Sequence, residues 1–214
     1  KTETPYAIYN GTLLLKPETR YYWRVRVSAE WTKHFIDSPI AAFETGKDNA
    51  ANWTAAWITD TFDKDEAPAP MLRKRFTAKN NIEQARLYIS AAGYYLFHIN
   101  GKPVTLSYLN PGFTHYDKRN LYNTYDVTPQ IKSGTNVLTA VLGSGFYNEA
   151  APVGTWDYEK ARWRNRPRMI CELHISYKDG SQQVINSDET WKTALGAYRQ
   201  DNIYSGDTYD AQQA

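Results

Sequence analysis

Carboxylic acids in the second half of the sequence are the side chains best suited to bond-breaking chemistry. Hydrolysis of a glycosidic bond needs two carboxyl groups across a sugar, and inverting enzymes hold them about 6.5–9.5 Å apart. The candidates for such a pair are Asp117, Asp126, Asp157, Glu159 and Asp188. Asp126 precedes Val-Thr and Asp188 stands beside Glu189, however, and acids at such places commonly form turns. The sequence therefore favours structural roles, and no catalytic residue is assigned.

A long loop between residues 146 and 166 has the composition expected of a sugar-binding surface. Aromatic rings pack against the CH groups of a pyranose, while amide and carboxylate oxygens bind its hydroxyls. The segment contains Pro152 and Gly154, and it is long for a hairpin connection, which is typical of functional loops. The alternative is that its tryptophans fold back over the protein or dock against another domain. The candidate binding residues are Tyr147, Asn148, Trp156, Asp157 and Trp163.

Other kinds of site find less support. The histidines are far apart and lack the spacing of zinc ligands. Gly143-Ser-Gly145 follows an expected strand, but no helix opens after it, so the context of a phosphate-binding loop is missing. The single cysteine, Cys171, cannot form an internal disulfide and reads as a small core residue. No cofactor is indicated by these patterns.

Charge and hydropathy also limit the partners. The 25 Lys and Arg residues against 23 Asp and Glu give a net charge of +2, and the charges are scattered, which does not favour nucleic acid as a partner. No stretch approaches the roughly 20 apolar residues of a membrane helix. The first residue is Lys1 and no leader-like apolar segment follows it, so we expect an excised piece of a longer protein.

The elements that must position these loops are strands. Tyrosine and tryptophan are abundant, and apolar residues alternate with polar ones along 94–99, 136–142 and 169–177, a period typical of half-buried strands. Shorter runs follow at 87–89, 184–186 and 191–193. Asn100-Gly101 and Asp179-Gly180 predict tight hairpin turns. Strands at this spacing without helices predict an all-β sandwich or jelly roll.

The first 47 residues carry a separate pattern. The run from Leu15 to Val27 resembles the tyrosine-corner turn and penultimate strand of a fibronectin type III domain, and Phe43-Glu-Thr45-Gly46 resembles its closing strand. A complete sandwich of that kind needs about 100 residues. We therefore predict that residues 1–47 are the C-terminal part of a fibronectin type III-like domain. Residues 48–70 are predicted to be a linker with one strand, and 71–214 a jelly-roll domain.

Several motifs narrow the jelly roll to a family. The segment from Gly93 to Val104 resembles a strand and hairpin of galactose-binding-like jelly rolls in glycoside hydrolases. It is followed by Asn110-Pro-Gly-Phe-Thr-His-Tyr-Asp117, by Tyr122-Asn-Thr-Tyr-Asp126 and by a tail from Asp201 to Ala211. This succession resembles the N-terminal region of bacterial α-L-rhamnosidases across residues 53–214.

The resemblance implies that the hydrolase is a longer, inverting enzyme whose catalytic helical toroid lies outside this sequence. The fragment is then not an enzyme but an accessory domain that helps to recognise or position rhamnose-containing glycans, with the catalytic domain of the same chain as its partner. The alternatives are an independent rhamnose-binding module and a purely structural domain. The location expected is extracytoplasmic, either periplasmic or secreted.

Some relatives in this family bind rhamnose with calcium, so the resemblance leaves calcium open as a cofactor. Calcium prefers hard oxygen ligands. Asn110, Asp117, Asn148 and Asp157 offer such oxygens, although no EF-hand spacing is present. Asn110 and Asp117 accordingly join the candidate binding residues.

Overall fold

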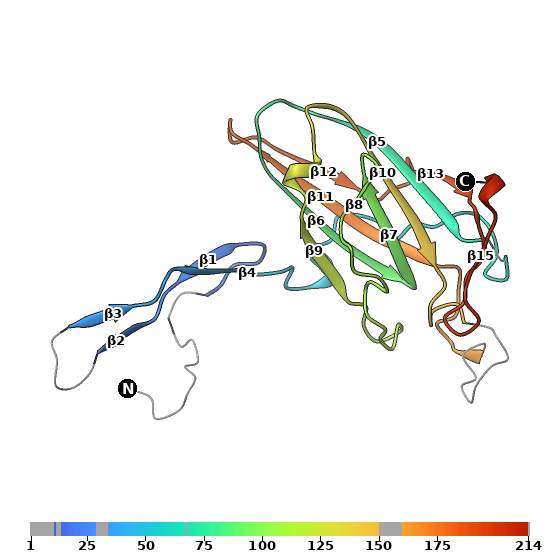
Figure 1. The fold of residues 1–214 in the computed structure, drawn as a ribbon, viewed down its shortest axis with the longest axis horizontal. Helices are drawn as coiled ribbons and strands as arrows, with labels where there is room; N and C mark the ends of the chain where they lie inside the picture. The colour runs from blue at the N-terminus through green and yellow to red at the C-terminus, as the bar shows by residue number, and fades with distance from the viewer. Residues whose placement is uncertain (1–10, 12–13, 29–33, 67, 150–159, 214) are drawn as a thin grey trace. The chain divides into compact units, whose positions relative to one another are not determined.

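The computed structural model describes residues 11, 14–28, 34–66, 68–149 and 160–213 (Figure 1). The chain divides into two compact units, Lys1–Asn52 and Trp53–Ala214. This boundary lies inside the stretch predicted as a linker. Among the described residues, no helix is both long and apolar enough to span a membrane.

The first unit consists of two short antiparallel ladders and a 3-10 turn. Strand β1 (Arg20–Trp23) pairs with β4 (Ala41–Glu44), and β2 (Arg26–Ser28) pairs with β3 (Phe35–Asp37), before η1 (Ala50–Asn52) ends the unit. The Tyr21 hydroxyl accepts a hydrogen bond of 2.6 Å from the backbone N–H of Lys16. A bond of this kind, from a tyrosine hydroxyl to backbone a few residues upstream, characterises a tyrosine corner. The fibronectin-like assignment of the unit as a whole stays a prediction.

The second unit is a jelly-roll β-sandwich of two antiparallel sheets, as the sequence predicts (Figure 1). One sheet has the order β13-β5-β10-β7-β8 and the other β12-β11-β6-β9. The first sheet is formed by β5 (Pro70–Ala78), β7 (Tyr94–Ile99), β8 (Lys102–Pro103), β10 (Gly134–Gly143) and β13 (Lys192–Leu195). The second is formed by β6 (Ile82–Ala92), β9 (Tyr122–Asp126), β11 (Arg168–Tyr177) and β12 (Gln182–Asn186).

Short elements complete the second unit. A 3-10 turn, η2 (Thr128–Gln130), follows β9. Near the C-terminal end, β14 (Tyr198–Gln200) pairs with β15 (Thr208–Tyr209), and η4 (Ala211–Gln213) follows. These pieces belong to the tail whose motif resembles the rhamnosidase pattern.

The core lies between the two sheets. Along β10 every second residue is buried, so Leu138, Ala140 and Leu142 point inward while their neighbours face outward. Leu87 of β6 and Leu173 of β11 meet them from the opposite sheet and are fully buried. Burying each such side chain stabilises the fold by about 1.5–3 kcal/mol.

Residues 54–58 complete the four-stranded sheet along β11, on the side where β12 ends. The N–H of Ala56 donates to the carbonyl of Ser187 at 2.8 Å, and Ile58 forms an antiparallel bridge with Met169. The N–H groups of Thr54 and Ala55 bind the carboxylate of Glu172, which is 1% exposed on the outer face of the sheet. This part of the predicted linker is therefore bound to the sandwich.

The two predicted hairpin turns differ in geometry. At the β7–β8 turn both Asn100 and Gly101 have positive φ, 52° and 78°, as a two-residue hairpin turn requires. At the β11–β12 turn only Gly180 is left-handed, with φ 82°, and its N–H donates to the carbonyl of Tyr177. Lys178 and Asp179 are thus the central residues of that turn, and the hairpin loop is longer than the two-residue form that the sequence predicts.

Candidate functional site

Aromatic side chains from two loops, the connections β8–β9 and β10–β11, gather at one end of the sandwich. The ring of Phe113 lies 4.8 Å from Phe146, Tyr116 lies 5.1 Å from Tyr147, and His115 lies 4.6 Å from Trp163, measured between centroids. We call this set the aromatic cluster. Its members are Phe113, His115, Tyr116, Phe146, Tyr147 and Trp163.

Backbone hydrogen bonds hold the loops of the aromatic cluster in place. The carbonyl of His115 accepts N–H bonds from Lys118 and Arg119, which closes a turn around Tyr116. After β10, the carbonyl of Ser144 accepts the N–H of Tyr147 at 3.2 Å. Gly145 makes this second turn possible, because its φ is +49° and a Cβ there would stand 2.7 Å from the Tyr94 ring.

Three of the predicted binding residues meet at the aromatic cluster. Tyr147 is a buried member, 8% exposed, and the indole N–H of Trp163 donates to the carbonyl of Phe146 at 3.4 Å. Asp117 lies beside the cluster, where its carboxylate contacts His115 Nδ1 and, at 3.1 Å, Nη2 of Arg162. The sequence predicts these residues without indicating that Phe113, His115 and Tyr116 would join them.

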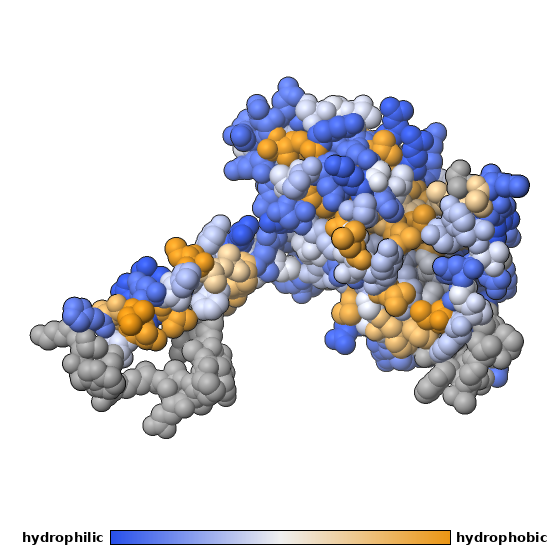
Figure 2. All heavy atoms as spheres, viewed as in Figure 1, coloured by the Kyte–Doolittle hydropathy of each residue, from blue (hydrophilic) through white to orange (hydrophobic). Residues whose placement is uncertain are grey.

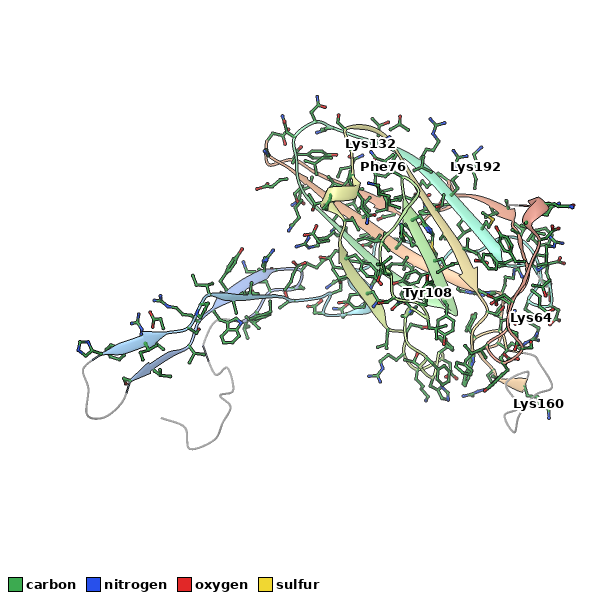
Figure 3. The ribbon with its side chains drawn as sticks, viewed as in Figure 1. Lys64, Phe76, Tyr108, Lys132, Lys160 and Lys192 are labelled. Carbon is green, nitrogen blue, oxygen red and sulfur yellow. The ribbon has the colours of Figure 1, made fainter. Side chains whose placement is uncertain are left out.

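The other predicted residues lie elsewhere. Asn110 donates to the carbonyl of Ser107 at 2.9 Å within its own loop, and its carbonyl accepts the N–H of Tyr95. Asn148 donates to the carbonyl of Lys64 at 2.7 Å, a residue labelled in Figure 3. Trp156 and Asp157 lie outside the described residues.

The oxygens predicted as calcium ligands are in unlike environments. The Oδ1 atom of Asn148 is buried and has no hydrogen-bond partner within the described ranges. Both oxygens of Asp117, in contrast, face cationic or protonatable nitrogens. Across the described part of the chain, no group of three or more His, Cys, Asp and Glu side chains is placed to hold a metal ion.

A pocket of about 360 Å³ lies over β7 and β10, and the sequence does not predict it. We call it the tyrosine pocket, since Tyr94, Tyr108 and Tyr198 line it together with the tail residues Asp201 and Asp207. Tyr108 is 77% exposed, and Figure 3 labels it in the loop that follows β8. Figure 2 shows apolar residues interrupting the hydrophilic surface of this unit, and the same loop contributes the exposed Leu106 and Leu109.

Two acids, Asp201 and Glu149, hold the tail against the loop that follows β10. Asp201 accepts the backbone N–H and the hydroxyl of Ser144. Burial raises the pKa of Asp201 and the charge of Asp207 adds to the rise, although the bonds from Ser144 oppose it. Glu149 is 3% exposed, and both its oxygens accept from Nδ2 of Asn202 at 2.9 Å. The pocket therefore owes its shape to the tail motif.

The topology of the two sheets defines the second unit as a jelly-roll domain of the galactose-binding-like class. The chain belongs to the α-L-rhamnosidase N-terminal domain family, whose sequence profile matches residues 80–214.

Curated relatives that align with most of this chain are also named α-L-rhamnosidases. An α-L-rhamnosidase of Formosa agariphila is 34% identical over 92% of the chain, and one of Alteromonas sp. is 30% identical over 94%. The chain spans 23% and 22% of those two proteins. It is thus similar to a minor part of each.

Solved structures of other α-L-rhamnosidases contain a region with a similar fold. The α-L-rhamnosidase of Dictyoglumus thermophilum is 35% identical with a TM-score of 0.81, covering 93% of this chain and 23% of that one. The enzyme of Aspergillus terreus is 29% identical with a TM-score of 0.83 and the same coverage. The Streptomyces avermitilis α-L-rhamnosidase, solved in complex with L-rhamnose, is 27% identical with a TM-score of 0.64 over 89% of this chain and 20% of that one.

Proposed function

We propose that this chain is a non-catalytic accessory region of an α-L-rhamnosidase, which recognises or positions rhamnose-containing glycans for a catalytic domain elsewhere in the parent chain. The observation that carries the proposal is the aromatic cluster of a rhamnosidase-family jelly roll, in which the carboxylate of Asp117 contacts His115 and the His115 ring packs against Trp163. Rings next to a polar group match the two kinds of surface that a pyranose presents. An extracytoplasmic location accompanies this proposal.

The partners of the candidate acids support a non-catalytic role. Asp126 accepts from the N–H and hydroxyl of Thr128 and forms an ion pair with Arg86 at 2.6 Å. Asp188 is bound by Lys74 and Thr190. Carboxylates held by cations and turn N–H groups are stabilised in the ionised form, whereas a general acid needs a carboxyl group that retains its proton.

The second candidate is an independent rhamnose-binding module that uses calcium. The Oδ1 of Asn148 favours it, because this buried amide oxygen has no hydrogen-bond partner among the described residues and is one of the ligands that calcium accepts. The third candidate is a purely structural domain that packs on the catalytic toroid. The burial of Tyr116 and Tyr147 favours this one, since buried rings stabilise a loop end without touching a sugar.

Titration calorimetry of the 214-residue chain with L-rhamnose and with a rhamnose-containing oligosaccharide, each with and without calcium, separates these candidates. The accessory role predicts heat with the oligosaccharide that Trp163→Ala abolishes. Trp23→Ala is the matched control, because Trp23 is a half-exposed tryptophan of the first unit. Calcium-dependent binding of rhamnose alone identifies the independent module, and an absence of heat throughout leaves the structural role.

A chromogenic rhamnoside tests the non-catalytic part of the proposal. The purified chain is expected to release no chromophore above the rate of buffer. Release that is lost in the Asp117→Asn variant would overturn the assignment and make this region catalytic.

A further inference from the structure

A small hollow under the aromatic cluster presents buried hydrogen-bond donors to a space of about 200 Å³. It lies where β6 ends and β11 begins, since Ala92 and Arg168 are paired residues of those strands. We call it the arginine hollow. The described residues that line it are Trp57, Ala92, Tyr116, Asn120, Tyr147 and Arg168.

Two of the donors in the arginine hollow lack an acceptor among the described residues. The Nε of Arg168 is buried and bonds to no group in the described part of the chain, and the guanidinium has only the Tyr147 ring, with Cζ 6.0 Å from its centroid. The hydroxyl of Tyr116, a residue 7% exposed, lies beside the backbone N–H of Gly93, but its own proton has no acceptor among the described residues. Buried polar groups are nearly always paired in folded proteins, so two in one hollow indicate a missing acceptor.

No acid of the described residues supplies that acceptor. None of the described lining residues is acidic, and three acids of the described ranges have other partners. Asp117 contacts Arg162 and His115, Glu172 binds Thr54 and His174, and Asp60 binds Arg166. The positive charge of Arg168, with the neutral hydroxyl donors of the tyrosines around it, favours an anion as the ligand.

The shape of the arginine hollow favours a sugar carboxylate. A guanidinium is a planar fork that matches the two oxygens of a carboxylate. No second Lys or Arg of the described chain lines the space, so a doubly charged phosphate would be only half neutralised. Trp57, at 40% exposed, supplies an aromatic wall of the kind that packs against a pyranose. The volume is below the roughly 300 Å³ of drug-sized pockets, which suits one acidic sugar residue.

We propose that the arginine hollow binds the carboxylate of a uronic acid residue that neighbours rhamnose in the glycan. In this arrangement Arg168 and the Tyr116 hydroxyl donate to the carboxylate, and the indole of Trp57 packs against the ring. The inference rests on the proposed accessory function, and it names the class of glycan as acidic.

Calorimetric titration of the 214-residue chain with D-glucuronate, D-glucose and sodium sulfate tests this. Glucuronate is expected to bind at least about tenfold more tightly than glucose, the factor that one charge-assisted hydrogen bond contributes. Sulfate that binds as tightly as glucuronate identifies a general oxyanion site and overturns the sugar assignment. Equal binding of glucuronate and glucose overturns the role of the charge.

Two variants locate the site. Arg168→Gln is expected to weaken glucuronate binding about tenfold or more, and Tyr116→Phe by about three- to tenfold, because each loses one donor to the anion. Arg75→Gln, which removes the same charge from an exposed position of β5, is the matched control and should bind like the parent chain. Unchanged binding in both Arg168→Gln and Tyr116→Phe would refute the location.

Folding and function are separated by two further measurements. Since the Tyr116 hydroxyl proton has no acceptor among the described residues, Tyr116→Phe loses only the contact with the Gly93 N–H and should unfold close to the temperature of the parent chain. Weaker binding by this variant then reports on the site itself. Parallel titration with L-rhamnose distinguishes the two proposals. If the chain binds glucuronate but neither rhamnose nor its oligosaccharide, the proposal for the arginine hollow holds and the rhamnose-positioning role is refuted. If it binds rhamnose or the oligosaccharide but not glucuronate, only the proposed uronate site is refuted.

Discussion

Arg166 and Asp60 form a buried, bidentate ion pair. Nε of Arg166 donates to Oδ1 of Asp60 at 2.9 Å and Nη2 donates to Oδ2 at 2.7 Å, while the two side chains are 4% and 1% exposed. The remaining donors reach the carbonyls of Glu66 and Pro68. One guanidinium thus fastens the segment that precedes β5 to the segment that precedes β11.

Removal of one partner of this pair should strongly destabilise the fold. In Asp60→Asn the buried guanidinium loses its counter-charge, and such losses cost about 3–5 kcal/mol. The free energy of unfolding in urea measures the effect. Asp65→Asn is the control, because Asp65 pairs with Arg164 at 2.6 Å but is 65% exposed, and exposed pairs contribute about 1 kcal/mol or less. Equal losses in the two variants would contradict the prediction.

Asp188 should make the fold less stable in acid. Burial opposes ionisation of this carboxyl, but hydrogen bonds from Lys74 and Thr190 outweigh it and hold the pKa below the ordinary value. A lowered pKa in the folded state means that the stabilisation is complete above the unfolded pKa of about 3.9 and is lost as the pH falls through the folded value.

The measurement for Asp188 is the melting temperature of the parent chain and of Asp188→Asn between pH 7 and pH 2. The variant should be less stable at pH 7 by roughly 1 kcal/mol, a figure that allows for the partial exposure of the pair. The difference between the two proteins should shrink toward pH 2. A difference that stays constant over this range would show that the charge of Asp188 does not matter.

Asp201 should behave in the opposite way. Its pKa is raised, first by burial and then by the neighbouring charge of Asp207, so the folded state holds the proton more tightly than the unfolded chain. Ionised Asp201 therefore costs stability at neutral pH, and that cost disappears as the pH falls from above the folded pKa toward about 3.9. Asp207→Asn removes one cause of the shift and should stabilise the chain at pH 7, with a smaller gain at pH 4. A loss of stability at pH 7 would contradict this reasoning.

Gly145 should tolerate no side chain. Gly145→Ala combines a positive φ with a methyl group 2.7 Å from the Tyr94 ring, so we expect a loss of about 2 kcal/mol or more in unfolding free energy. Gly180→Ala is the control, since Gly180 also has a positive φ, of +82°, but a methyl group there would meet nothing within 4 Å. The control should lose only about 1 kcal/mol. Equal losses of unfolding free energy in the two variants would show that the contact with the Tyr94 ring does not matter.

Much of the sandwich is readable from the sequence because burial alternates along β7 and β10 and over the second half of β11. The runs at 94–99, 136–142 and 169–177 correspond to β7, β10 and β11. The sequence pattern does not reveal β5 and β9. In β5 the charged Arg73, Lys74 and Arg75 mask the buried Leu72 and Phe76, and β9 is a polar strand at the sheet edge. Alternation identifies strands best where one face is wholly apolar.

The candidate site is less predictable. The loop 146–166 points to Tyr147 and Trp163, but their partners Phe113 and Tyr116 come from a loop some thirty residues earlier, which the sequence uses only as a family motif. Tyr94 reads as an ordinary strand residue, although it lines the tyrosine pocket under the tail. A two-residue period shows that Tyr94 faces outward, yet it carries no information about which distant segment covers that face.

The antiparallel bridge between Ile58 and Met169 of β11 also covers a strand edge that could otherwise pair with another molecule. Where β12 ends, the N–H and C=O groups of β11 would form an open strand edge, the feature through which sheets of separate molecules join into dimers and fibrils. Ile58 occupies that edge through two backbone bonds with Met169, of 2.8 and 3.0 Å, and the N–H of Ala56 donates to the carbonyl of Ser187, the residue after β12. A version of this domain trimmed to start at β5 would keep its hydrophobic core but expose a template for aggregation.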